Sequence, residues 1–97
     1  MYLVHPPRPD FIATITPEEG AIMAGAHSDY LTRLFEEGTL VLAGPTWGQP
    51  MNDGVAIIEA EDEAAATAIM QADPAVASGM MTGELREMRV SFLRGRD

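Results

Sequence analysis

The sequence predicts an α+β fold in which one antiparallel sheet carries both helices on one face, in the order β-α-β-β-α-β of the ferredoxin-like folds. Short apolar stretches alternate with two segments of helical periodicity, and no repeat or linker divides the 97 residues. Hydrophobic residues make up 46% of the chain and charged residues 22%, which is the balance of a globular protein. We therefore expect residues 1–97 to form a single domain.

The first half of the chain predicts a strand, a loop and a long helix. Residues 1–5 form the strand, and residues 8–15 follow as an irregular, extended loop. Thr16 and Glu19 have the spacing of a capping box, which marks the start of the helix. The helix then runs on to Gly38, because glycine readily adopts the left-handed conformation that ends helices.

Two strands come next. Residues 40–43 form the first of them, Gly44 and Pro45 break it, and a loop with Trp47 follows. Residues 55–60 form the second strand after a turn.

The last third of the chain predicts a helix and a final strand. The helix covers residues 63–72, and residues 74–78 add one further turn. A long strand then runs from Met80 or Met81 to Leu93.

The strands predict a partner. A sheet with helices on one face should alternate apolar and polar residues, because its other face is wet. The three strands over residues 1–4, 40–43 and 55–60 are instead apolar on both faces. We therefore expect a homodimer packed sheet to sheet, as in dimeric α+β barrels, with a site near that interface or at the sheet edge.

The composition excludes several functions. The net charge of −9 disfavours nucleic acid and anionic membranes as partners, and no apolar run is long enough to span a membrane. The chain has no cysteine and no lysine, so thiolate and side-chain Schiff-base chemistry are excluded. No nucleotide-binding glycine motif is present, and no cofactor and no metal are expected. The N-terminal residues do not resemble a signal peptide, so a cytoplasmic location is expected.

Four of the six arginines follow residue 85. They form either a local basic edge on an acidic protein or merely the solvated side of the last strand.

His27 and Asp73 are the candidate catalytic residues. Histidine titrates near neutral pH, and a carboxylate can orient its ring for acid/base work. Each residue also has a purely structural interpretation, His27 as a core histidine bonded to the backbone and Asp73 as a turn or cap residue before Pro74. The two lie far apart in the sequence, so only the fold can join them. His5 is the other histidine of the chain. His5, His27 and Asp73 have side chains that can bind zinc or iron, but no ligand motif supports such a metal site.

In this order of elements the chain resembles the YCII-related (YciI-like) family of small α+β proteins along nearly its whole length. The matching residues are Met1-Tyr2-Leu3-Val4, His27, Tyr30-Leu31, Leu34, Gly38, Leu40, Ala43-Gly44-Pro45, Ile57-Ile58-Glu59-Ala60, Asp73-Pro74, Val76 and Gly79. The resemblance implies a ferredoxin-like dimer with a His-Asp pair in a pocket, which maps onto His27 and Asp73. One branch of the family is linked to dehydrochlorination of a chlorinated aromatic ring. The chain departs from the family at Ala75, where many members carry an aromatic residue, and over residues 8–15.

We therefore expect a small enzyme that needs no cofactor and uses His27 as general acid or base, oriented by Asp73. Elimination or isomerisation of an aromatic or cyclic small molecule suits such a pair. The alternative is a non-catalytic dimeric domain that binds a ligand or assists another protein. An enzyme requires His27 to face a cavity, whereas an accessory domain does not. The residues expected to bind substrate are Tyr30, Gly44, Pro45, Trp47 and Pro74.

Overall fold

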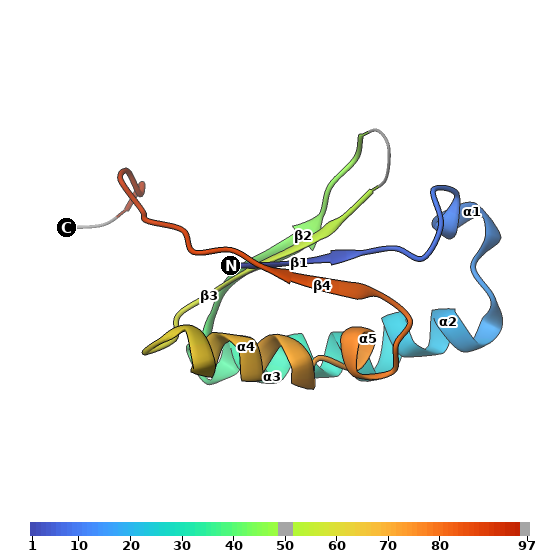
Figure 1. Ribbon diagram of the computed structural model, residues 1–97, viewed down its shortest axis with the longest axis horizontal. Coiled ribbons are helices and arrows are strands. Elements are labelled where there is room, and N and C mark those ends of the chain that lie inside the picture. The colour runs from blue at the N-terminus through green and yellow to red at the C-terminus, as the bar shows by residue number, and fades with distance from the viewer. Residues whose placement is uncertain (49–51, 96–97) are drawn as a thin grey trace.

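The structure of the protein, a computed structural model, describes residues 1–48 and 52–95 and contains one four-stranded antiparallel sheet (Figure 1). Its strands are β1 (Tyr2–His5), β2 (Leu40–Pro45), β3 (Gly54–Ile58) and β4 (Thr82–Leu85). The order across the sheet is β2-β3-β1-β4, which two interleaved β-α-β units produce. The predicted α+β class with an antiparallel sheet is confirmed.

The helical segments are α1 (Phe11–Thr14), α2 (Pro17–Ala21), η1 (Ile22–His27), α3 (Ser28–Glu36), α4 (Glu63–Ala72) and α5 (Pro74–Ala77). The segments α2, η1 and α3 follow one another without a break, and α3, α4 and α5 lie on one side of the sheet (Figure 1). Within the described part of the chain, no helix is both long and apolar enough to cross a membrane.

The long helix begins as its sequence predicts. The Thr16 hydroxyl accepts a hydrogen bond from the Glu19 backbone N–H (3.1 Å), and the Glu19 carboxylate accepts one from the Thr16 N–H (2.9 Å). The expectation of an uninterrupted α-helix is wrong, because η1 is π-helical. A π turn closes its hydrogen bonds over one more residue, which rotates the residues that follow around the helix axis. His27 is the last residue of this segment.

The predicted boundaries differ from the structure at three places in the first two thirds of the chain. The expected extended loop before the long helix contains the short helix α1, whose Phe11 is buried against the core. The expected break at Gly44 and Pro45 is absent, and β2 continues through both. Proline lacks an N–H, but β2 is an edge strand and has a neighbour on one side only. Strand β3 ends at Ile58, two residues earlier than expected.

The final strand is shorter than the sequence predicts, since β4 ends at Leu85 and not at Leu93. Strand β4 pairs with β1 from His5 back to Tyr2, and the Arg86 N–H donates to the Met1 carbonyl (2.9 Å). The residues after Arg86 lie beyond the length of β1 and have no strand to pair with among the described residues.

The core lies between the sheet and the helices. Tyr2 and Val4 of β1 face the helices, and Ala56 of β3 lies opposite Tyr2. The other buried apolar residues are Phe11, Tyr30, Leu34, Leu40, Met70, Ala75 and Met81. Among the described residues, Asp73 is the one buried residue with an acidic or basic side chain.

Candidate active site

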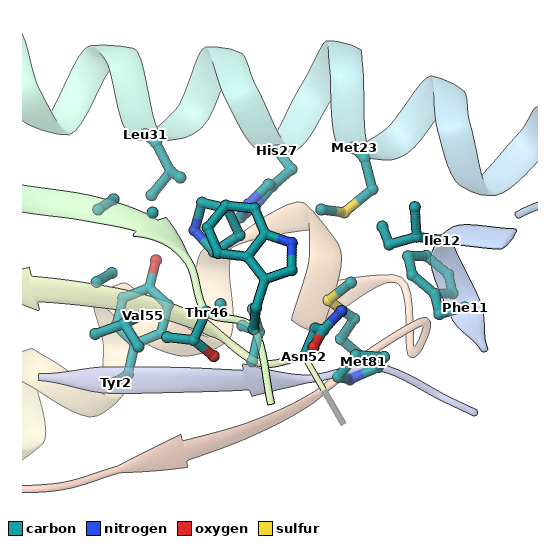
Figure 2. A pocket seen from close by; sticks show the side chains of 18 residues that line it. Tyr2, Phe11, Ile12, Met23, His27, Leu31, Thr46, Asn52, Val55 and Met81 are labelled. Carbon is teal, nitrogen blue, oxygen red and sulfur yellow. The ribbon is translucent and has the colours of Figure 1, made fainter. Parts of the chain in front are cut away.

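The structure brings His27 and Asp73 together. His27 ends η1, and its ring points from the helix toward the sheet (Figure 2). Its Nδ1 lies 2.6 Å from Asp73 Oδ1, and the two side chains are 12% and 0% exposed. The imidazole thus bonds to a buried carboxylate, which differs from the interpretation of His27 as a core histidine bonded to the backbone.

Asp73 is fixed by its position between α4 and α5. The residue before a proline avoids helical dihedrals, and Asp73 adopts φ −62° and ψ 123°. Its Oδ1 accepts a hydrogen bond from the Ala75 N–H (2.9 Å), which caps α5, and its Oδ2 accepts one from the Tyr2 hydroxyl (2.9 Å). Asp73 therefore both caps α5 and holds the His27 ring.

These contacts determine which nitrogen of His27 carries the proton. The Ala75 N–H can only donate, and the Tyr2 hydroxyl donates to the other carboxylate oxygen. Burial raises the pKa of the Tyr2 hydroxyl far above its ordinary value, and the nearby Asp73 raises it further, so the phenol keeps its proton. An ionised Asp73 therefore acts as an acceptor on every side, and Nδ1 of His27 then donates to it. In the neutral ring Nε2 then carries a free lone pair.

An apolar cavity of about 470 Å³ lies between the sheet and the long helix and includes His27 in its wall. Apolar residues from several elements form most of that wall, namely Val4, Pro6, Phe11, Ile12, Met23, Leu31, Val55 and Met81. Its other polar side chains belong to Tyr2, Thr46, Trp47 and Asn52. Among the described residues that line the cavity, none is an arginine, aspartate or glutamate.

The predicted substrate-binding residues divide into two groups. Gly44, Pro45 and Trp47 line the cavity, and the Trp47 side chain is 81% exposed. Tyr30 and Pro74 are absent from its wall. The Tyr30 hydroxyl donates to the Ile69 carbonyl (2.7 Å) and thereby joins α3 to α4, while Pro74 occupies the first turn of α5.

Sequence reasoning missed several residues of the site. Tyr2 is the most important, because it donates to Asp73 across 71 residues of sequence. A signal was present, since a tyrosine on an otherwise aliphatic strand needs a buried partner for its hydroxyl. Phe11, Met23 and Asn52 were also missed, because nothing in the pattern marks them as pocket residues.

Replacement of Tyr2 by phenylalanine is expected to lower the free energy of unfolding by about 1.5–3 kcal/mol, because it removes a hydrogen bond to a buried charged group. Tyr30→Phe is the matched control, since it removes a hydrogen bond to a neutral carbonyl and should cost about 0.5–1.5 kcal/mol. Urea denaturation measures both. Equal stability of Tyr2→Phe and the unmodified protein would contradict the described contact.

The second histidine lies outside this cavity. His5 Nδ1 is 2.8 Å from Asp53 Oδ1, and Nε2 is 2.8 Å from Glu84 Oε1. Both partners are carboxylates, so both ring nitrogens can donate only when the ring is protonated. The hydrogen bond to Asp53 and then that to Glu84 raise the pKa of His5 above 6.5. Within residues 1–48 and 52–95 no three His, Cys, Asp or Glu side chains are arranged to bind a metal ion.

A raised pKa of His5 makes stability depend on pH. The stabilisation is complete below the pKa of the unfolded state, near 6.5, and is lost as the pH rises through the higher folded-state pKa. The midpoint of urea denaturation should therefore fall between pH 6 and pH 9, and it should fall less in His5→Gln. An identical fall in both proteins would show that His5 is not the titrating group.

The fold and the site together define a small α+β protein with a His-Asp pair at the wall of an apolar cavity. The chain belongs to the YCII-related domain family, whose model matches residues 1–89.

One solved structure with a similar fold is 5-chloro-2-hydroxyhydroquinone dehydrochlorinase from Burkholderia phenoliruptrix AC1100 in complex with 2,5-dihydroxybenzoquinone. The two chains are 21% identical, with a TM-score of 0.58 over 89% of this chain and 91% of that chain. No curated protein sequence matches the chain significantly.

Proposed function

We propose that the protein is a cofactor-independent enzyme for small aromatic or cyclic molecules, with His27 as its general acid or base. One observation carries the proposal: His27 is held by a buried carboxylate at 2.6 Å and also lines a cavity of about 470 Å³. A ring fixed at Nδ1 presents Nε2 for proton transfer. Asp73 keeps the ring in that orientation and stabilises the imidazolium that forms.

The wall of the cavity favours a particular substrate chemistry. Its lining is mainly apolar, and no charged arginine, aspartate or glutamate lies among its described residues. A substrate with a carboxylate or phosphate therefore finds no countercharge there, whereas a flat ring with hydroxyl groups fits the apolar walls. Thr46 and Asn52 offer hydrogen bonds to such hydroxyls.

Elimination or isomerisation is the reaction class that suits this site. In an elimination, His27 Nε2 takes one proton from a ring hydroxyl or carbon, and the electron pair left behind moves into the ring. A leaving group such as chloride then departs with its bonding electrons, so the substrate loses one proton and one anion in total. The similar fold of the hydroxyhydroquinone dehydrochlorinase supports a test of this chemistry first.

The test uses purified protein without added cofactor and a panel of hydroxylated and chlorinated hydroquinones. We expect release of chloride from at least one chlorinated member, measured by ion chromatography, and binding of 2,5-dihydroxybenzoquinone, measured by calorimetry. Binding of the quinone without turnover of any member would favour the alternative, a non-catalytic ligand-binding domain. If the protein neither binds the quinone nor turns over any member of the panel, the proposed substrate class is wrong.

We also propose that the protein is a homodimer packed sheet to sheet. The exposed apolar side chains Val41 and Leu42 on edge strand β2 support this proposal. The cytoplasmic location stays a prediction.

A further inference from the structure

The segment after β4 has the sequence of a strand, but the described part of the chain offers it no strand to pair with. Met88, Val90 and Phe92 alternate with Arg89 and Ser91, which is the two-residue period of a half-buried strand. The structure nevertheless ends β4 at Leu85, and the segment extends away from the fold (Figure 1). We call residues 86–93 the C-terminal arm.

The apolar side chains of the arm are exposed. Phe92 is 97% exposed, Leu93 55%, Met88 50% and Val90 43%. Single exposed apolar residues are common, but four within six residues of an extended segment form a surface that favours a partner.

The charge of the arm differs from that of the rest of the chain. Residues 86–93 contain two arginines and one acidic residue, whereas residues 1–85 contain two arginines and thirteen acidic residues. A basic, apolar segment is thus attached to a strongly acidic domain. The surface that complements the arm is one that is acidic and apolar, and a second copy of this chain supplies it.

Figure 1 shows that α3, α4 and α5 lie on one side of the sheet. The residues on its opposite face supply the apolar part of that surface. Leu3 of β1 lies there, because its neighbours Tyr2 and Val4 point to the helices. Ile57 of β3 follows Ala56, which is buried opposite Tyr2, and so shares the face of Leu3.

We propose that the C-terminal arm of each copy packs against this face of a second copy. The proposal rests on the homodimer proposed above and names the segment that forms it. Exchange of two identical arms across a two-fold axis makes a closed dimer, since each copy both gives and receives one arm. The alternating pattern of residues 88–92 then has a sheet to cover, which the single chain does not provide.

The first test measures the mass of the full chain at micromolar concentration by sedimentation equilibrium. We expect the unmodified protein to have twice the 10.4 kDa of one chain. Phe92→Asp should raise the dissociation constant by more than about tenfold, because it places a charge in the interface. Phe35→Asp is the matched control, since Phe35 is 63% exposed on α3, and its dimer should stay intact.

The outcomes distinguish the proposed docking of the arm from the proposed homodimer. An unmodified protein that is monomeric would overturn both proposals. If Phe92→Asp leaves the dimer unchanged, the proposed docking of the arm is wrong, and the packing of sheet on sheet remains.

A second test locates the arm directly. The chain contains no cysteine, so Ser91→Cys offers a unique position for a spin label. Labelled protein is mixed with an isotopically labelled copy that carries no spin label. We expect the amide signals of Leu3 and Ile57 in the second copy to broaden. If neither amide signal broadens in a dimeric sample, the proposed docking face is wrong.

Discussion

Replacement of His27 by glutamine is expected to lower turnover by about 10²–10⁴-fold, the usual contribution of a general acid or base. Glutamine retains polar atoms near Asp73 but cannot take up a proton at neutral pH. The fold should survive, because the side chain lies at the cavity wall and not inside the core. Steady-state rates on the substrate found in the hydroquinone panel measure the effect.

His5→Gln is the matched control for this substitution, because it changes the other histidine of the chain, which does not line the cavity. Its turnover should equal that of the unmodified protein. Turnover of His27→Gln within about twofold of the unmodified protein would remove His27 from the mechanism.

Replacement of Asp73 by asparagine is expected to lower turnover by about 10²–10⁴-fold and the free energy of unfolding by about 1–3 kcal/mol. The buried carboxylate accepts from three donors, on His27, Ala75 and Tyr2. An amide offers an oxygen on one side only. If the oxygen stays beside Ala75, the amide N–H₂ meets the Tyr2 hydroxyl, and if the amide flips, it meets His27 Nδ1 and the Ala75 N–H.

The flipped amide would also move the proton of the neutral imidazole from Nδ1 to Nε2. Nδ1 would then accept a hydrogen bond, and Nε2 would carry the proton, so the cavity would face a donor instead of a base. Asp29→Asn is the control, because Asp29 is an exposed carboxylate in the first turn of α3. Full turnover in Asp73→Asn would show that the orientation of His27 does not depend on the carboxylate.

The sequence predicts most of the architecture, because its local signals agree with the fold. The capping box at Thr16 and Glu19 and the proline after Asp73 act over a few residues, and both behave as expected. The π-helical segment η1 was not predictable from periodicity, since one extra residue per hydrogen bond leaves only a small shift in the apolar pattern.

The extent of a strand depends on its neighbours and not only on its own residues. The alternation through Phe92 predicts a long last strand, but β1 is too short to pair with it beyond Leu85. The site has the same limit. His27 and Asp73 were identifiable by their chemistry, whereas Tyr2 and Met23 enter the site only through the folded arrangement.

The most direct test of the central claim is the protonation state of the His27 ring nitrogens, measured by ¹⁵N NMR of the imidazole. The spectrum is recorded at a pH where the ring is neutral, with and without 2,5-dihydroxybenzoquinone. We expect Nδ1 to carry the proton, because Asp73 accepts it at 2.6 Å, and Nε2 to be unprotonated and to shift when the quinone binds. A proton on Nε2, or an Nε2 signal that the bound quinone leaves unchanged, would contradict the proposed role of His27.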